Sequence, residues 1–446
     1  MALTKSPEAA PVTADDFSAR LAALGVDQDF AIAVSGGRDS MALARLAAIY
    51  GKTKGLRVTA LTVDHGLRPE SSDEAAQVAR WCKAAGLVHR ILAWDGEKPT
   101  TGIQNAARRA RYKLLAGAAN DIGIETILTA HSADDQAETV FMRLARGAGP
   151  TGLAAMRAIG HVAAAGGRPV RLVRPLLSIS RAQLTATVAE FEQAFVDDPS
   201  NDDPGYERIR TRALLAALQE QGLLTQTELL RTATRMQDAA QLLRAQEDAL
   251  LQSLGGCFYQ WGGIAVDLER ASQTSKNAVH GLCRRVIYAV GGQDYAPDIE
   301  AAGKAFHQVI EKGAATLGGA LLKSHQQRLW FLREPAALLG RAGIQKLMPL
   351  QVAPEGNALW DNRFVISAPM GGDNVEIEPL GARENPSAGA YFRQFGAPED
   401  ARRTIPGVYR KGALIGAPYA LSSNSGGVRF TSLCRERFGG EIIRFS

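Results

Sequence analysis

The sequence feature that most constrains the fold of this chain is a glycine-rich loop between a strand pattern and a helix pattern. The apolar run at residues 30–34 predicts a buried strand, and helix-forming residues begin at Met41. Between them lies Ser35-Gly36-Gly37-Arg38-Asp39-Ser40. Two glycines let the backbone approach an anion, the next amides face outward at a helix N-terminus, and the two serines add hydroxyl donors. The loop therefore predicts a phosphate-binding site.

Strand and helix patterns alternate along the first ~200 residues, as in βαβ units. This alternation predicts an α/β domain with a doubly wound parallel sheet, whose ligands bind beyond the carboxyl ends of the strands. The predicted strands are 30–34, 57–63, 88–94, 125–130 and 169–174, and the predicted helices are 40–50, 69–85 (with Pro69 at the first helical position), 103–119 and 133–146.

Asp39 lies inside the predicted phosphate loop, where its carboxylate would repel a triphosphate. A Mg²⁺ ion shared between Asp39 and the phosphates would remove this repulsion. Asp39 or Ser40 could also cap the following helix, and the two roles are compatible. In its strand-to-helix context, SGGRDS resembles the loop of the PP-loop pyrophosphatases. The resemblance implies ATP binding by Ser35, Gly36, Gly37, Arg38, Asp39 and Ser40, and cleavage of ATP between its α- and β-phosphates.

Other polar residues fall on neighbouring helices and strand ends. Arg108 and Arg111 are three positions apart in a predicted helix and share one face. His131 follows the fourth predicted strand. Asp135 and Glu138 have the same three-residue spacing, so both carboxylates can point at one substrate. We expect Asp135 and Glu138 to lie away from the phosphate loop.

The order of these motifs over residues 28–212 resembles the catalytic domain of the tRNA(Ile)-lysidine synthetase family. The family commonly has two adjacent histidines, whereas this chain has His131-Ser132, so a role for the second imidazole is not carried over. Farther along, Trp360-Asp361-Asn362-Arg363-Phe364 resembles the family's C-terminal region. The remaining motifs that carry the resemblance are Asp64-His65-Gly66, Arg174-Pro175-Leu176-Leu177, Asp198-Pro199-Ser200-Asn201 and Arg208-Ile209-Arg210.

The resemblance implies that the chain converts the wobble cytidine of tRNA(Ile) with a CAU anticodon to lysidine. ATP would first adenylate the C2 carbonyl oxygen and release pyrophosphate, and the ε-amine of free L-lysine would then attack C2 and expel AMP. Arg108 or Arg111 would stabilise charge on the activated base or the phosphate. Asp135 and Glu138 would bind the base edge and the lysine ammonium, so that they serve the lysine or the base rather than ATP. The implied catalytic residues are Asp39, Arg108, Arg111, His131, Asp135 and Glu138, with ATP and Mg²⁺ as cofactors.

The length of 446 residues predicts several domains. We expect a PP-loop catalytic domain at residues 1–215, a mainly helical linker and tRNA-binding domain at 216–347, and a smaller, basic α+β domain that binds tRNA at 348–446. Residues 391–446 carry nine Lys and Arg against four acids, together with Tyr391, Phe392, Tyr409 and Phe430. Such a segment is either a phosphate-contacting surface or an ordinary basic surface.

Four widely separated cysteines fit neither a disulfide framework nor a metal site, so we expect reduced structural thiols. No apolar run approaches the length of a membrane span or a secretory signal. We therefore expect a cytoplasmic protein that does not bind membranes, and a homodimer is among the assemblies that the sequence allows.

Two further segments match nucleotide-binding motifs but lack the strand that precedes such a motif. Gly51-Lys52-Thr53 resembles the end of a Walker A loop but follows a helix pattern, and the GxGxxG match at residues 147–152 also follows a helix. Three other functions remain open. A tRNA thiolase would need catalytic cysteines, an amidating ligase such as a GMP or NAD synthetase would need an ammonia source, and a tRNA-binding protein without activity would have no use for an intact loop.

Overall fold

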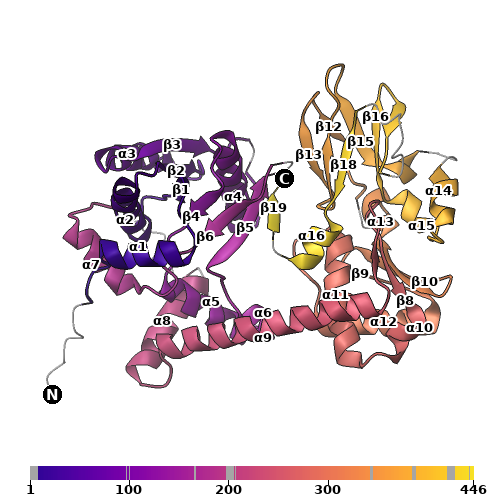
Figure 1. The fold of residues 1–446 in the computed structure, drawn as a ribbon, viewed down its shortest axis with the longest axis horizontal. Coiled ribbons are helices and arrows are strands. Elements are labelled where there is room, and N and C mark those ends of the chain that lie inside the picture. Colours follow the sequence, from indigo (N-terminus) through magenta and orange to yellow (C-terminus); the bar gives the residue numbers. More distant parts are fainter. Residues whose placement is uncertain are drawn as a thin grey trace. The chain divides into compact units, whose positions relative to one another are not determined.

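The computed structural model describes residues 9–96, 98–99, 101–164, 167–196, 205, 207–341, 345–383, 388–418, 427–440 and 442–445. The chain divides into two compact units, unit 1 (Met1–Leu243) and unit 2 (Arg244–Arg444) (Figure 1). The three domains predicted from the sequence stay a prediction. The predicted turn at Asp198 to Asn201 lies outside the described residues.

A largely parallel sheet forms the centre of unit 1. β1 (Phe30–Ala33) pairs in parallel with β2 (Val58–Asp64) and with β4 (Thr126–Leu128). β3 (Val88–Ala93) continues the sheet beyond β2, and β6 (Val170–Val173) continues it beyond β4. All five predicted strands are therefore present, and the predicted fold class is confirmed.

The strand that lies beside β6 in this sheet, on the side away from β4, was not predicted. β5 (Ile159–Ala164) pairs antiparallel with β6. Its second half consists of small residues that run toward glycines, a composition with low strand propensity. Pairing with β6 stabilises this strand in the fold despite that composition.

Helices cover both faces of the sheet, as a doubly wound fold requires. On one face, Phe17 of α1 (Ala14–Ala23), Met41 of α2 (Arg38–Lys54) and Leu184 of α7 (Arg181–Glu190) share a core with Phe30 and Ile32. On the other face, α4 (Ile103–Asp121) packs its buried side chains against Ala31 and Leu61. Successive residues of β1 thus point into opposite cores, which explains why this strand is apolar throughout.

The predicted helices in unit 1 are present with shifted ends. α2 begins at Arg38, two residues early, and α3 (Ser71–Ala84) begins after Pro69, which is therefore not its first residue. α5 (Ala133–Ala145) matches the expected range. α1 was missed although Thr13 accepts a hydrogen bond from the Asp16 amide, the local pattern of a capped helix start.

The helical pattern predicted from residue 180 to about 254 is confirmed by α7, α8 (Glu207–Glu220) and α9 (Gln226–Ser253). The two motif matches rejected on context are also explained. Lys52 lies inside α2, and the match at residues 147–152 is the turn from α5 into the short α6 (Pro150–Leu153).

Unit 2 is built from three antiparallel sheets and several helices. A five-stranded sheet, ordered β7-β8-β11-β10-β9, packs against α11 and α12, and the later strands form sheets of four (β12-β15-β16-β17) and three (β13-β14-β18). The β-like character predicted after residue 348 is confirmed. The elements are β7 (Cys257–Phe258), β8 (Ile264–Asp267), α10 (Leu268–Gln273), α11 (Lys276–Gly291), α12 (Ile299–Lys312), β9 (Ala314–Leu317), β10 (Ala320–His325), β11 (Arg328–Arg333), α13 (Pro335–Leu339), β12 (Leu350–Val352), β13 (Asn357–Trp360), β14 (Phe364–Ser367), β15 (Val375–Pro379), η2 (Leu380–Ala382), α14 (Ala388–Gln394), α15 (Asp400–Arg403), β16 (Pro406–Arg410), β17 (Ala413–Gly416), β18 (Arg429–Ser432) and α16 (Cys434–Gly439), followed by β19 (Ile442–Phe445).

The described helices include none that is both long and apolar enough to cross a membrane.

Candidate active site

The phosphate loop joins β1 to the N-terminus of α2. Gly37 is the N-cap residue of α2 and no side chain caps it, so the first amides of the helix have no side-chain acceptor. Ser40 is turned inward: its hydroxyl donates to the Gly37 carbonyl oxygen at 2.8 Å and accepts from the Ser35 amide at 3.2 Å. These contacts hold the loop in an open arc with its amides available to an anion.

Gly36 is required by this loop. Its φ of +88° is one that side chains rarely adopt, and a Cβ there would lie 2.7 Å from Val78 Cγ2. The Gly36 carbonyl oxygen also accepts a hydrogen bond from the Val196 amide at 2.9 Å. The loop is therefore fixed by packing and by a long-range backbone contact.

Asp39 lies on the first turn of α2 and meets two arginines. Arg38 Nε lies 3.0 Å from Asp39 Oδ1, and Arg181 Nε lies 3.5 Å from Asp39 Oδ2. Burial raises the pKa of Asp39, although Arg38 and Arg181 oppose this shift. A nearby divalent cation would favour the ionised carboxylate in the same way as the arginines do.

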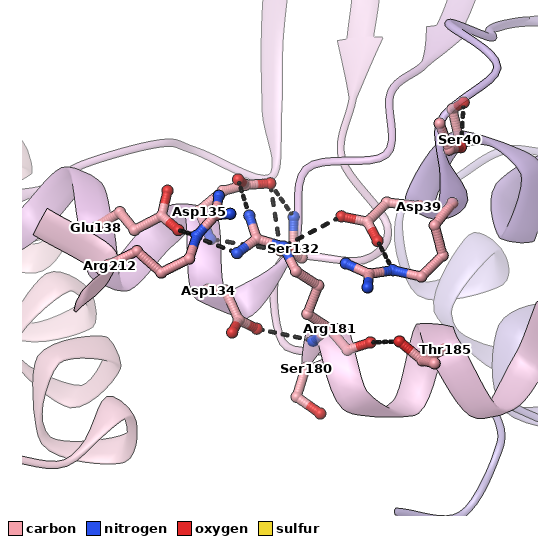
Figure 2. A network of polar contacts seen from close by, with 12 residues as sticks. Asp39, Ser40, Ser132, Asp134, Asp135, Glu138, Ser180, Arg181, Thr185 and Arg212 are labelled. Carbon is pink, nitrogen blue, oxygen red and sulfur yellow. Dashed lines mark hydrogen bonds and ion pairs between the residues drawn. The ribbon is translucent and has the colours of Figure 1, made fainter. Parts of the chain in front are cut away.

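Arg181 connects the phosphate loop to helix α5 (Figure 2). Its Nη2 lies 3.0 Å from Asp135 Oδ1, and its Nη1 lies 3.1 Å from Glu138 Oε1. The amide of Arg181 donates to Asp134 Oδ2 at 2.7 Å, and Ser180 caps α7 with Gln183. Asp39, Asp135 and Glu138 are thus brought together around one guanidinium group. The expectation that Asp135 and Glu138 lie away from the phosphate loop is therefore wrong, because α7 supplies an arginine that sequence reasoning did not place between them.

Two further arginines from α8 converge on the same carboxylates. Arg208 contacts Glu138 Oε2 at 2.7 Å and Asp135 Oδ1 at 3.0 Å, and Arg212 contacts Glu138 Oε1 at 3.0 Å. Glu138 is only 2% exposed, so both of its oxygens are occupied by arginines inside the protein. A substrate would meet Asp135 and the arginines before it met Glu138. The catalytic roles of the two carboxylates stay predictions.

Sequence reasoning missed Arg181 and Arg212. Ser180 and Gln183 have the spacing of a capping box, which could have placed Arg181 at a helix start. Arg208 and Arg212 are four positions apart on a helix and so share a face. Neither signal indicates that these faces meet α5, because those contacts are made only in the folded chain.

Ser132 and His131 have separate roles at the start of α5. The Ser132 hydroxyl accepts from the Asp135 amide and Asp135 accepts from the Ser132 amide, which forms a capping box. His131 Nδ1 lies 2.9 Å from Thr129 Oγ1. Removal from water, and then the charges of Arg174, Arg111 and Arg108, lower the pKa of His131 well below its usual value. His131 is therefore a neutral imidazole at pH 7.

Arg108 and Arg111 do share one face of α4, as predicted. Their guanidinium carbons lie 5.1 and 5.2 Å from the ring centroid of Tyr112. The charges of both arginines contribute to the lowered pKa of His131, which follows β4. At the end of β2, Asp64 accepts hydrogen bonds from the Gly66 amide and the Ser72 hydroxyl.

A cavity of about 140 Å³ lies between α5, α8 and α9. Its walls combine leucines with acidic side chains and one arginine. Among them are Asp134, Glu138, Arg212, Leu215, Leu224 and Leu229.

The four cysteines are free, as predicted. Cys82, Cys283 and Cys434 are buried, and burial raises the pKa of the Cys82 thiol to about 12. Such a thiol is not a nucleophile at neutral pH. In the described residues there is no group of three or more His, Cys, Asp or Glu that could hold a metal.

The basic C-terminal segment is partly neutralised within unit 2. Lys411 pairs with Asp373 at 2.8 Å and Arg402 with Glu399 at 2.6 Å, while Arg437 donates to backbone carbonyl oxygens. Phe392 and Tyr409 are 2% and 4% exposed and belong to the core. The basic character of the described surface therefore rests on the exposed Arg393, Arg403, Arg429 and Arg435.

The motif at residues 360–364 is a β-hairpin turn that anchors unit 2 internally. Asp361 accepts from Arg333 Nη2 at 2.9 Å and from Arg363 Nε at 2.6 Å, and all three side chains are at most 6% exposed. The Arg363 guanidinium also donates to the Thr404 carbonyl oxygen at 2.5 Å. This buried network is structural.

Comparison with known proteins shows which protein family this chain resembles. A family model described as a PP-loop domain (ATP_bind_3) matches residues 13–218. The tRNA(Ile)-lysidine synthase of Methylobacterium nodulans is 39% identical over 343 residues, which are 74% of this chain and 99% of that protein. The corresponding synthase of Ruegeria pomeroyi is 36% identical over 408 residues, which are 88% of this chain and 89% of that protein.

A synthase from a Bradyrhizobium species is 47% identical over 224 residues, but the match spans only 61% of that protein and 50% of this chain. Among solved structures, a U34-tRNA thiolase from Methanococcus maripaludis matches with a TM-score of 0.42 and 18% identity, covering 50% of this chain and 79% of that one. The phosphate loop thus belongs to a PP-loop domain in unit 1. With a match across almost the whole of two curated relatives, the chain belongs to the tRNA(Ile)-lysidine synthase family.

Proposed function

We propose that this enzyme ligates lysine to C2 of the wobble cytidine in tRNA(Ile) with a CAU anticodon, through an adenylated cytidine. One observation carries the proposal: Arg181 joins Asp39 of the phosphate loop to the carboxylates of α5. An ATP-binding element and a second group of polar residues therefore form one site, as a reaction in two steps requires.

In the first step, the C2 carbonyl oxygen of cytidine attacks the α-phosphorus of ATP, and pyrophosphate leaves with the bonding electron pair. The outward amides of the loop at Gly37 and beyond would hold the departing phosphates. The positive charges of Arg108 and Arg111 would stabilise the negative charge that grows on the α-phosphate.

Mg²⁺ would enter this site together with ATP. Magnesium commonly binds through one or two carboxylates plus substrate phosphates, and Asp39 supplies one carboxylate beside the loop. The absence of a larger acidic or histidine group among the described residues fits a metal that is held mainly by the nucleotide. Bound there, Mg²⁺ would offset the charge of the phosphates.

In the second step, the neutral ε-amine of lysine attacks C2, the bond from C2 to the adenylate oxygen breaks, and AMP leaves. The amine must lose a proton, for which Asp135 is the more accessible carboxylate, at 14% exposure against 2% for Glu138. The cavity beside Glu138 would suit lysine, because leucines can contact the methylene chain and Asp134 can bind an ammonium group.

The neutral state of His131 supports a role at the base. Close to several arginines, an uncharged imidazole can donate or accept a hydrogen bond without adding repulsion. An anticodon loop is single-stranded, so its cytidine can leave the stack and reach such a pocket. We therefore propose that His131 contacts the edge of the wobble base.

The proposed site requires ATP, free lysine and tRNA together, which suits an enzyme of the cytoplasm. A homodimer is also proposed, and analytical ultracentrifugation tests it directly.

Pyrophosphate release tests the first step. With ATP and Mg²⁺, we expect release that requires tRNA(Ile) with the CAU anticodon and that does not require lysine. Transcripts with any other wobble base serve as the matched control. Release that is equally fast without tRNA would contradict the proposal.

A further inference from the structure

Three arginines surround Tyr112 at the carboxyl-end edge of the sheet in unit 1. Arg108 and Arg111 lie 5.1 and 5.2 Å from its ring centroid, and Arg174, which follows β6, interacts with its phenol. Tyr112 itself is 3% exposed, so its buried ring lies beneath the arginines. We call Arg108, Arg111 and Arg174 the arginine cluster.

Among the described residues, no carboxylate pairs with the arginine cluster. In the described part of the chain, none of its three guanidinium groups forms an ion pair with a carboxylate, whereas Arg181, Arg208 and Arg212 all do. Arg174 Nη1 donates to the Arg157 carbonyl oxygen at 2.8 Å, but its buried Nε has no acceptor. A buried donor without an acceptor is costly, so this arrangement favours an external anion.

The positive charges of the cluster act on Tyr112 and on one another. Burial would raise the pKa of Tyr112, yet Arg111, Arg108 and Arg174 together lower it below its ordinary value. Burial lowers the pKa of Arg174, and Arg108 contributes to the same shift. An anion placed among these groups would remove the repulsion.

We propose that the arginine cluster binds a backbone phosphate of the RNA loop next to the target nucleotide. The inference rests on the proposed function, because it needs an RNA substrate. A guanidinium group presents paired donors that match phosphate oxygens. The phosphate loop at α2 already offers amides for the nucleotide, whereas the cluster lies on α4 and after β6. Its function would be to position the loop while other groups read the base.

Arg108→Gln tests the proposal, since Arg108 is exposed and its loss should not affect folding. Lys113→Gln is the matched control, because Lys113 is an exposed cation on the same helix outside the cluster. The probe is a CAU anticodon stem-loop RNA. We expect Arg108→Gln to weaken RNA binding about tenfold and to reduce the log–log salt slope by about 0.7 to 0.9. Arg108 is proposed to act on the α-phosphate only as charge grows there during the reaction, so the affinity for ATP without RNA should change much less than the affinity for RNA.

Phosphate replacement identifies the contact. Each loop phosphate is replaced in turn by an uncharged methylphosphonate, and binding to wild type and to Arg108→Gln is compared. At one phosphate position, the methylphosphonate should lower the RNA affinity of wild type but not that of Arg108→Gln, because the variant already lacks the contact with this phosphate. Arg174→Gln should show the same coupling at that position.

Three outcomes would overturn the proposal. Loss of ATP affinity with intact RNA affinity would assign the cluster to the nucleotide phosphates. Unchanged binding of both ligands would assign it to folding, and additive losses at every phosphate would exclude a specific contact. Failure of the proposed function looks different: wild-type protein would then not bind the CAU stem-loop at all.

Discussion

Arg181 connects the phosphate loop with the carboxylates of α5. Its guanidinium contacts Asp39, Asp135 and Glu138, which belong to α2 and α5. Removing any one carboxylate would leave a partly buried positive charge without part of its compensation. The position of the phosphate loop and the position of α5 are therefore electrostatically coupled.

Asp39→Ala should reduce ATP-dependent modification by at least about 100-fold, because a charge-stabilising group at the phosphates is lost. The fold should persist, since Arg181 keeps its contacts with α5. Turnover and thermal unfolding are measured in parallel. Asp29→Ala is the control, because the Asp29 side chain is 42% exposed and pairs with Arg57 outside the site. Wild-type turnover by Asp39→Ala at ordinary Mg²⁺ would remove Asp39 from the mechanism.

His131 should make stability depend on pH in a defined direction. The pKa of His131 in the folded state lies well below the ordinary 6.5. Just below pH 6.5, the imidazole is therefore protonated in the unfolded chain but not in the folded chain. Its contribution to stability is thus complete above pH 6.5 and is lost as the pH falls below that value.

The check compares wild type with His131→Gln between pH 7.5 and 5.5. The free energy of unfolding should fall less steeply in the variant, by up to about 1.4 kcal/mol per pH unit. Equal slopes in the two proteins would mean that His131 is protonated in the folded state.

At the level of elements, the sequence predicted the central sheet well because hydrophobic patterns report local structure. The five parallel strands and helices α2 to α5 all appeared within a few residues of the predicted ends. β5 was missed because its stability comes from pairing with β6 rather than from its own residues. Arg181 and Arg212 were missed for a related reason: their partners lie 43 and 74 positions away along the chain.

Ser132 shows how one residue can serve an element where the family commonly has a histidine. It is fully buried and caps α5, the helix that carries Asp135 and Glu138. The hydroxyl thus fixes the start of the helix that carries these two carboxylates, a role that does not need an imidazole.

Ser132→Ala should destabilise the protein by about 1 kcal/mol, the usual effect of losing an N-cap. In thermal unfolding this corresponds to a decrease of about 2 to 4 °C for a domain of this size. Thr185→Ala is the control, since Thr185 is an exposed residue inside α7. Equal midpoints for both variants would show that the capping box does not stabilise α5.

At the level of the whole molecule, charge is distributed unevenly. Nine basic residues of the C-terminal segment were predicted to contact RNA phosphates. Some of them form ion pairs within the protein, as Lys411 and Arg402 do, so fewer positive charges remain for RNA. The tRNA-binding role predicted for the C-terminal region would therefore rest on the arginines that remain exposed.

Replacing Arg393, Arg403 and Arg429 with Gln in the full-length chain should weaken tRNA binding and flatten its salt dependence, by about 0.7 to 0.9 in slope for each lost contact. Because such contacts do not read sequence, CAU and non-CAU tRNAs should lose affinity alike. Lys411→Gln is the matched control, since Asp373 already neutralises Lys411. An unchanged slope in the triple variant would show that this surface serves another purpose.

Mass spectrometry of the wobble nucleoside tests the central claim most directly. The full-length protein is incubated with ATP, Mg²⁺, L-lysine and tRNA(Ile) bearing the CAU anticodon, and the nucleosides are then released and weighed. The wobble cytidine should gain the mass of lysine less one water, and only when both ATP and lysine are present. An unmodified cytidine under these conditions, or a mass gain that does not require lysine, would contradict the proposed reaction.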